Sequence, residues 1–305
     1  MGGTPCAVGI DLGGTKLSGA LVDRQGRILR SARAPTPAKG GPQAVFTAIR
    51  RLISSLIDQA GDHEVLGIGL GICGPVDAAA GLSIQSPNLG WAQTPVLEHF
   101  RSFGLPLAME NDVRCHAIGE LHFGAGRGVR NFILIALGTG IGSGIVLDGR
   151  LYGGPKGVAG EIGHIVLEPG GPLCGCGKQG CFEAIASGVA IGRRANEAGL
   201  GATARELFEL AAAGNGQALR LVDQVAYDLG RGISTYINLM NPQRVILGGG
   251  VARAGALLFD PLRRYTEQET MPCIRSTYEI LPAELGDEAG VIGAAALVPG
   301  LAGKA

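Results

Sequence analysis

The feature that most constrains the fold is a short internal repeat, found near the N-terminus and again near the middle of the chain. Residues 12–23 align without gaps on residues 137–148, 125 positions later. The identical pairs are Leu12/Leu137, Gly13/Gly138, Ser18/Ser143, Gly19/Gly144 and Asp23/Asp148. Each copy contains an apolar strand, a Gly/Thr turn, a second apolar strand and a further turn. Glycines can match by chance in a chain that contains 53 of them, but agreement of all these features in one register favours a duplication.

After each copy the pattern changes to alternating helices and strands, which is typical of α/β proteins. For the first half the sequence predicts a helix from Pro42, a strand over 65–72, a short helix capped by Thr94-Pro95, a strand over 105–109 and a helix opened by Asn111-Asp112. For the second half it predicts a helix with the capping box Thr203/Glu206, a helix over 216–240 that Asn241-Pro242 ends, a strand over 245–247 and a further helix.

The repeat and the alternation together predict two similar α/β lobes, each led by a hairpin. We expect one lobe to comprise residues 1–111 and 291–305 and the other to comprise residues 112–290. A ligand is expected between the lobes, where the glycine turns of the two copies converge.

Composition excludes several classes of protein. Lys+Arg and Asp+Glu number 26 each, so no excess of charge predicts a nucleic-acid or anionic-membrane partner. Hydrophobic residues at 46% and charged residues at 17% exclude a disordered chain. The longest uncharged apolar stretch, residues 131–147, is too short to cross a bilayer, and the N-terminus lacks the features of a signal peptide. A cytoplasmic protein is therefore expected.

Glycine-rich patterns in this chain need a structural context before they carry meaning. Gly69-x-Gly71-x-x-Gly74 matches the dinucleotide-binding fingerprint but runs into Pro75 rather than a helix. Gly175-x-Gly177-x-x-Gly180 also matches, and lies among cysteines. No P-loop motif occurs in the sequence, so the P-loop class is excluded.

The turn of the first copy is a better candidate for phosphate binding. It carries an acid, two glycines, a hydroxyl and a cation: Asp11, Gly13, Gly14, Thr15 and Lys16. The glycines would present backbone N–H groups to phosphate oxygens, and the aspartate is placed to hold Mg²⁺ directly or through water. The second copy keeps a turn, Gly138-Thr139-Gly140, and has Ala136 in place of the acid, as expected for one nucleotide held from both sides. The alternative is a pair of tight hairpins with a turn aspartate.

One histidine and three of the seven cysteines form the pattern H-x9-C-x-C-x4-C: His164, Cys174, Cys176 and Cys181. Three thiolates and an imidazole fill a tetrahedral Zn²⁺ shell and leave no position for a reactive water, so a structural zinc is predicted. The alternative is a coincidence of core cysteines, but this loop is rich in Gly and Pro. An odd number of cysteines, crowded in this way, is typical of a reducing compartment. The other four are expected to be small core residues: Cys6, Cys73, Cys115 and Cys273.

Together these motifs resemble those of the ROK family of bacterial sugar kinases and repressors, which have the actin-like ATPase (ribonuclease H-like) fold. The resemblance covers essentially the whole chain and includes the segments Gly9–Lys16, Glu110-Asn111-Asp112, Leu137–Gly142, Glu161-x-Gly163-His164, Gly175–Glu183 and Gly248-Gly249-Gly250. Within the family, the glucokinases are the most similar. The resemblance implies ATP, Mg²⁺ and zinc as cofactors, a homodimer, a nucleotide held by both glycine turns and by the Gly248-Gly249-Gly250 turn, and phosphorylation of a hexose, with glucose favoured.

The predicted metal cluster would also fix two carboxylates. Glu161 lies three residues before His164, and Glu183 lies two residues after Cys181. A metal-bound imidazole keeps its other N–H free to donate, to a neighbouring acceptor or to a substrate hydroxyl. Alone, each glutamate would be an ordinary solvated loop charge. The resemblance implies that the sugar is bound by Asn88, Asn111, Asp112, Glu161, His164 and Glu183.

Asp112 is the candidate catalytic residue. The resemblance implies a general base that takes the proton of a sugar hydroxyl as that hydroxyl attacks the γ-phosphorus of ATP. Without the resemblance, Asp112 could equally be an ordinary helix N-cap. The sequence departs from the family after this residue, because Val113-Arg114-Cys115-His116 stands where small residues are common. The packing behind the base is therefore open, and His116 is expected to be a surface or core histidine rather than a catalyst.

Three alternatives to a glucokinase remain at this point. The first is a kinase for N-acetylglucosamine, N-acetylmannosamine, mannose or fructose, because the pocket around the sugar 2-position depends on packing. The second is a sugar-responsive repressor, which the few residues ahead of Gly9 and the lack of a basic patch disfavour. The third is a catalytically silent sugar-binding protein, which the presence of Asp11 and Asp112 disfavours.

Overall fold

The computed structural model describes residues 3–303, and these form two compact units. The first unit contains the described chain up to Arg130, the segment Gly144–Ala159 and the chain from Glu284 onward. The second contains Asn131–Ser143 and Gly160–Ala283. The lobe boundaries expected from the sequence, after residues 111 and 290, stay a prediction. Among the described helices, none is long and apolar enough to span a membrane.

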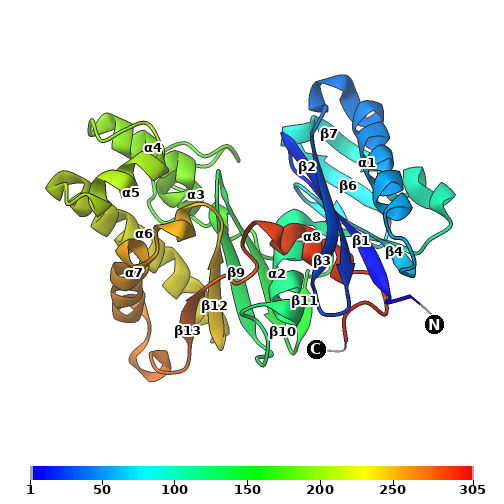
Figure 1. Cartoon of the computed structure of the whole chain (residues 1–305). Coiled ribbons are helices and arrows are strands. Elements are labelled where there is room, and N and C mark those ends of the chain that lie inside the picture. The colour runs from blue at the N-terminus through cyan, green and yellow to red at the C-terminus, as the bar shows by residue number, and fades with distance from the viewer. Residues whose placement is uncertain (1–2, 304–305) are drawn as a thin grey trace. The chain divides into compact units, whose positions relative to one another are not determined.

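The first unit is built on a five-stranded mixed sheet (Figure 1). Its strand order is β3 (Ile28–Pro35), β2 (Lys16–Asp23), β1 (Cys6–Leu12), β4 (Val65–Ile72) and β8 (Leu107–Asn111). The strands β1, β2 and β3 are antiparallel neighbours, because tight turns join them, whereas β4 and β8 run parallel to β1. The carboxyl ends of β1, β4 and β8 therefore meet at one edge of the sheet.

Alternate residues of the sheet face two different helical layers. Val8, Ile10 and Leu12 belong to one apolar core with the buried face of α1 (Gly41–Asp58). Ala7, Ala20 and Val22 belong to another core with α8 (Ala289–Ala296), which lies beside α2 (Asp112–Phe123). Figure 1 shows α1 and α8 on opposite faces of the sheet. This two-sided burial explains why β4 is a nearly continuous apolar run.

Small residues allow α8 to pack unusually close to the sheet. A Cβ atom placed on Gly9 would lie 1.9 Å from the carbonyl oxygen of Val291. A Cβ atom placed on Gly69 would lie 1.8 Å from the carbonyl oxygen of Ala294. Neither strand could carry a larger residue here without moving the helix, so part of the dinucleotide-like glycine pattern has a packing role.

A small antiparallel sheet in the first unit shows where the sequence-based assignment is wrong. It comprises β5 (Val76–Asp77), β6 (Leu82–Ser86) and β7 (Trp91–Pro95). Thr94-Pro95 ends the edge strand β7 rather than capping a helix, and a 3₁₀ helix over Leu97–Phe103 begins after Val96. Proline lacks a backbone N–H, and an edge strand tolerates that loss as readily as a helix N-terminus does.

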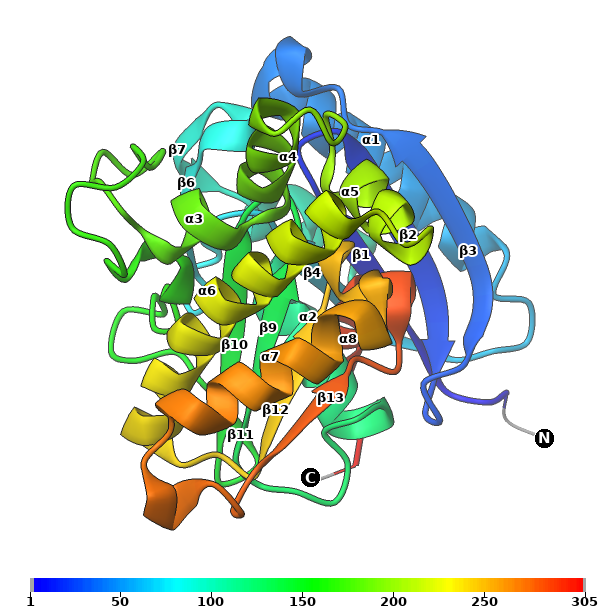
Figure 2. The same ribbon diagram turned by 90° about the vertical axis from the view of Figure 1, so that its left-hand side faces the viewer.

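The second unit contains three parallel strands, with β12 (Arg244–Gly248) between β9 (Phe132–Leu137) and β13 (Glu279–Pro282). Strand β10 (Ile141–Leu147) starts in this unit and continues into the first, where it pairs with β11 (Arg150–Tyr152). The helices are α3 (Phe182–Ala186), α4 (Gly188–Glu197), α5 (Ala204–Ala212), α6 (Gly216–Met240) and α7 (Ala256–Glu269). Helix α6 packs along α7 (Figure 2).

Local signals in the second unit act as the sequence predicts. The capping box of α5 is present, with Thr203 and Glu206 each hydrogen-bonded to the other's backbone. Helix α6 is followed by its C-cap Asn241, which takes the left-handed conformation with φ of 44°, and then by Pro242. Asparagine tolerates that conformation and proline cannot continue a helix, so the two residues together stop α6 at Met240.

Candidate active site

The carboxyl edge of the first sheet gathers four of the residues that the sequence singles out. Across the parallel strands, Asp11 pairs with Gly71, and Gly71 pairs with Glu110. Asn111 is the last residue of β8 and Asp112 the first residue of α2. Ligands of open α/β sheets commonly bind at this edge.

Asp11 lies at the end of β1, next to the predicted phosphate turn. The turn is closed by a 2.9 Å hydrogen bond that the Gly13 N–H donates to the Lys16 carbonyl, and it leaves Thr15 and Lys16 exposed. Burial raises the pKa of Asp11, while the charges of His116 and Lys16 act in the opposite direction. A partly desolvated carboxylate is a suitable ligand for a hard cation.

Asn88 is brought to the same turn from a distant part of the sequence. It lies in the 3₁₀ helix Pro87–Leu89, and its side chain is exposed. A Cβ atom placed on Gly14 would lie 2.7 Å from the Cβ atom of Asn88. The turn and Asn88 are therefore in direct contact, as a nucleotide site next to a sugar site would require.

Asp112 is held by its neighbours, but it is not the N-cap of α2. The N-cap is Asn111, whose Oδ1 accepts a 3.1 Å hydrogen bond from the Arg114 N–H. Asp112 Oδ1 accepts 2.9 Å hydrogen bonds from the Val113 N–H and from Asn111 Nδ2. The capping alternative for Asp112 is therefore wrong, since the preceding residue performs that role.

The environment of Asp112 favours its protonated form. Burial, followed by the negative charge of Asp11, raises its pKa from 3.8 to about 7, against the hydrogen bonds from Val113 and Asn111. A carboxyl group with a pKa near neutrality can accept a proton from a hydroxyl group and release it again at physiological pH.

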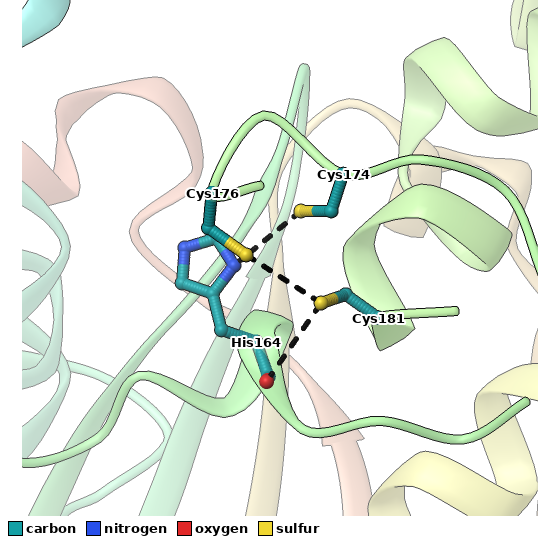
Figure 3. Close-up of side chains that lie close together, drawn as sticks. All are labelled: His164, Cys174, Cys176 and Cys181. Atoms are coloured by element: carbon teal, nitrogen blue, oxygen red, sulfur yellow. Dashed lines mark hydrogen bonds between the residues drawn. The ribbon is translucent and has the colours of Figure 1, made fainter. Parts of the chain in front are cut away.

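In the second unit, the residues of the predicted metal cluster lie close together, and no other such group is found within residues 3–303. One ligand atom of each residue lies within 4.8 Å of all the others. His164 Nδ1 is 3.6 Å from Cys174 Sγ, and Cys176 Sγ is 3.6 Å from Cys181 Sγ. Figure 3 shows the imidazole and the three thiols turned towards one another. The expectation that the remaining cysteines are core residues holds for Cys6, Cys73 and Cys115, but Cys273 is exposed.

The two glutamates next to this cluster make different contacts. Glu161 Oε2 lies 3.9 Å from His164 Nε2, the ring nitrogen that faces away from Cys174. Glu183 Oε2 accepts a 2.9 Å hydrogen bond from the Ile141 N–H, directly after the second glycine turn. Glu183 thus connects the cysteine loop with the turn at residues 138–140.

A cavity of about 940 Å³ opens beside the second glycine turn. Gly138 and Thr139 form one side of it, and the start of α4 forms another, where the Gly188 N–H donates a 2.8 Å hydrogen bond to the Gly138 carbonyl. Apolar and charged side chains complete the lining: Val189, Phe208, Leu257, Arg205, Glu209 and Arg253. Helix N-termini favour anions, and apolar walls favour a flat ring, so the cavity suits a nucleotide.

The cavity includes some predicted nucleotide-binding residues and several that the sequence did not indicate. Gly138, Thr139 and Gly250 line it, whereas Gly140, Gly248 and Gly249 do not. The charged and aromatic residues of α5 were missed. The only local signal near them is the capping box of α5. A capping box shows where a helix begins, but not which other parts of the chain the helix lies against.

Comparisons with known proteins agree with this geometry. The ROK family model matches residues 7–300. Glucokinase from Thermotoga maritima is 38% identical over 308 residues, which cover 95% of this chain and 96% of that protein. N-acetylmannosamine kinase from Citrobacter koseri is 38% identical over 297 residues, which cover 95% and 98%. The crystal structure of a ROK family glucokinase from Streptomyces griseus in complex with glucose and AMPPNP matches with a TM-score of 0.83 at 35% identity, covering 96% of this chain and 99% of that one. This chain belongs to the ROK family.

Proposed function

We propose that this chain is an ATP-dependent hexokinase that transfers the γ-phosphoryl group of ATP to a hexose, with glucose as the preferred substrate and glucose 6-phosphate as the product. The observation that carries the proposal is the half-buried Asp112 carboxylate at the sheet edge, with its pKa raised to about 7 next to Asp11. The 38% identity to glucokinase from Thermotoga maritima supports glucose as the substrate.

Asp112 acts as the general base. As the sugar hydroxyl oxygen forms its bond to the γ-phosphorus, its proton moves to Asp112, and the bond from phosphorus to the β,γ-bridging oxygen breaks to release ADP. The hydrogen bonds from Val113 and Asn111 leave one oxygen of the Asp112 carboxylate, Oδ2, for the hydroxyl group. Sugar hydroxyls are bound by Asn88, Asn111, Asp112, Glu161, His164 and Glu183.

ATP is held by both glycine turns. In the second unit, the nucleoside occupies the cavity beside Val189 and Phe208, and the phosphates lie towards Gly138 and the start of α4. The remaining nucleotide contacts are assigned to Gly13, Gly14, Thr15, Lys16, Thr139, Gly140, Gly248, Gly249 and Gly250. Asp11 is the acid that would hold Mg²⁺, and bound Mg²⁺ neutralises charge on the phosphates.

The four clustered side chains fit Zn²⁺. Tetrahedral coordination with Zn–S bonds of about 2.3 Å places neighbouring sulfurs about 3.8 Å apart. The observed separation of Cys176 Sγ and Cys181 Sγ is 3.6 Å. With His164 and Cys174 all four positions are filled, so the metal would organise the loop and take no part in the reaction. His164 Nδ1 faces the cluster, which leaves the Nε2–H for Glu161 or for a sugar hydroxyl.

A kinase for N-acetylmannosamine is the second candidate, because a kinase for that sugar from Citrobacter koseri is also 38% identical to this chain. A coupled assay of ADP release over a panel of sugars distinguishes the two. The expected result is the highest kcat/KM with glucose. A higher value with N-acetylmannosamine would replace glucose as the substrate, and no release with any sugar would reject the kinase.

Two further assignments accompany this function. An enzyme that consumes ATP and depends on reduced thiols fits the cytoplasm, and we place it there. The homodimer expected from the family resemblance stays a prediction, which sedimentation of the purified protein would test.

A further inference from the structure

Arg114 is a buried cation directly behind the candidate catalytic residue. It lies in the first turn of α2, and its side chain is 6% exposed. Arginine is rarely buried unless it is paired. The contacts of this one extend in two directions, towards the turn that carries Asp112 and towards the segment that follows β11.

On the catalytic side, the Arg114 side chain reaches Asn111 through Glu110. Its guanidinium lies 3.3 Å from the Glu110 carboxylate, whose side chain is 12% exposed. Glu110 Oε1 also accepts a 2.8 Å hydrogen bond from the Asn111 N–H. The backbone N–H of Arg114 itself donates to Asn111 Oδ1. Glu110, which the Arg114 guanidinium contacts, therefore holds Asn111 through its backbone, whereas the bond to the Asn111 side chain comes from a backbone N–H that any residue at position 114 would supply.

On the other side, the Arg114 side chain contacts the loop after β11. Its Nη1 donates a hydrogen bond to the Gly157 carbonyl. Its Nη2 fills the space beside Gly153, where any Cβ atom would come within 2.2 Å of that nitrogen. Within the same segment, the Ala159 N–H donates a 2.9 Å hydrogen bond to the Gly153 carbonyl. The segment leads directly to a proposed sugar-binding residue, because Gly157 precedes Glu161 by four positions.

We propose that Arg114 is a positioning residue for the kinase reaction, which clamps the loop 153–157 to the Glu110–Asp112 turn and so sets the geometry of the sugar site. The proposal rests on the proposed function. It concerns geometry, because the Arg114 side chain reaches the turn that carries Asp112 through its contact with Glu110, which in turn bonds the Asn111 N–H. Both contacts are made by one nitrogen, Nη1, which lies 3.3 Å from Glu110 Oε1 and donates to the Gly157 carbonyl, so a single charged donor joins the two segments.

The test compares Arg114→Met with the wild type in steady-state kinetics, corrected for the folded fraction. We expect KM for glucose to rise and kcat to fall, each by about 10-fold or more, because the loss of groups that orient binding residues typically costs about 10–100-fold. KM for ATP should stay unchanged. Wild-type KM and kcat per folded molecule would show that Arg114 is only structural and would overturn the proposal.

Two further variants separate clamping from simple charge neutralisation. Glu110→Gln/Arg114→Met removes both buried charges, so it should recover stability without recovering KM for glucose. Recovery of KM in this double variant would overturn the proposal. Arg114→Lys keeps one charged nitrogen on a shorter side chain, and is expected to lie between Arg114→Met and the wild type.

The matched control is Arg194→Met. Arg194 also bridges a carboxylate and a carbonyl, at 2.7 Å from Asp228 and 3.2 Å from the Ile185 oxygen, with a side chain 20% exposed. This variant should lose stability while keeping KM for glucose. If KM for glucose rises as much in Arg194→Met as in Arg114→Met, the effect comes from a general loss of stability, and the proposed role of Arg114 is wrong.

A measurement that does not depend on catalysis tests the role of Arg114 separately from the proposed kinase function. Hydrogen exchange at the Gly157 and Ala159 amides, both bonded within the loop, reports whether the clamp holds. We expect faster exchange in Arg114→Met than in Arg194→Met. Unchanged exchange overturns the clamp even in an active kinase, whereas a wild type inactive with every sugar rejects the proposed function alone.

Discussion

At the scale of single residues, Asp112 offers the most direct test of the proposed chemistry. Asp112→Asn keeps the volume and an acceptor oxygen for the Val113 N–H and the Asn111 amide, but it removes the base. General-base catalysis contributes roughly 10²–10⁴-fold, so kcat is expected to fall on that scale. The measurement is turnover with glucose and ATP, alongside thermal unfolding. A variant that retains turnover per folded molecule would show that Asp112 is not the base.

The raised pKa of Asp112 also predicts a pH dependence. The base must be deprotonated to act, so kcat/KM should fall tenfold per pH unit below the pKa of about 7. Stability should change in the opposite sense. Between 3.8 and about 7 the folded protein holds this proton more tightly than the unfolded chain, so the contribution of Asp112 to stability decreases as pH rises through that window.

Thermal unfolding between pH 5 and pH 8 checks this sign. Asp112→Asn has no proton to release, so it should be at least as stable as the wild type at pH 8, and its advantage should shrink towards pH 5. If the variant is less stable at pH 8 than at pH 5 relative to the wild type, the carboxyl group does not have a raised pKa.

Individual residues of the site differ in how readily the sequence predicts them. Asp11, Asp112 and the four-residue metal cluster stand in motifs whose spacing is local, and the structure brings the members of each motif together. The roles assigned to them stay predictions. Arg114 and Phe208 carried no such signal, because their partners lie on other elements. Asn111 and Asp112 are both good capping residues, so only the backbone geometry shows that Asn111 is the cap.

At the scale of elements, the contact of α8 with β4 leads to a prediction about packing. A methyl group on Gly69 would lie 1.8 Å from the Ala294 carbonyl oxygen, so Gly69→Ala must displace the helix. Overpacking of this kind costs about 1–3 kcal/mol, which urea unfolding would measure. The control is Gly216→Ala at the start of α6, where the nearest atom, Arg220 Nη1, is 3.7 Å away. If Gly69→Ala is as stable as that control, α8 does not pack on β4 as described.

Helices and strands with strong local signals were predicted well. The bounds of β4 and α6 agree with the sequence, because one is a buried apolar run and the other has a 3.6-residue period and a defined stop. Thr94-Pro95 was misassigned, because the same two residues can begin a helix or end an edge strand. Only the pairing of β7 with β6, which is a tertiary contact, decides between them.

At the scale of the whole molecule, the repeat correctly predicted an α/β chain whose two copies each supply a pair of strands separated by a glycine turn. Residues 291–305 were expected in the first lobe, but the sequence did not predict that Gly144–Ala159 joins the first unit. Gly144–Ala159 and the chain from Glu284 onward join the first unit although they follow parts of the second in sequence. Periodicity reports which face of an element is buried, but the identity of the covering element depends on contacts between distant residues.

The sugar-binding and nucleotide-binding roles proposed for the second unit should be separable by removing the metal. The loop with His164 and Cys176 would need zinc to hold Glu161 and Glu183, whereas the nucleotide cavity is lined by the turn after β9 and by α4 and α5. Cys176→Ser should release the metal and weaken sugar binding by about 10–100-fold, while nucleotide affinity persists. Zinc content and both affinities are measured on one preparation, with Cys273→Ser, an exposed cysteine outside the cluster, as the control. Normal sugar affinity in a zinc-free Cys176→Ser protein would mean that the loop keeps its shape without the metal. Because Glu183 also bonds the Ile141 N–H, equal losses of sugar and nucleotide affinity would show instead that the loop and the glycine turn act as a single structure.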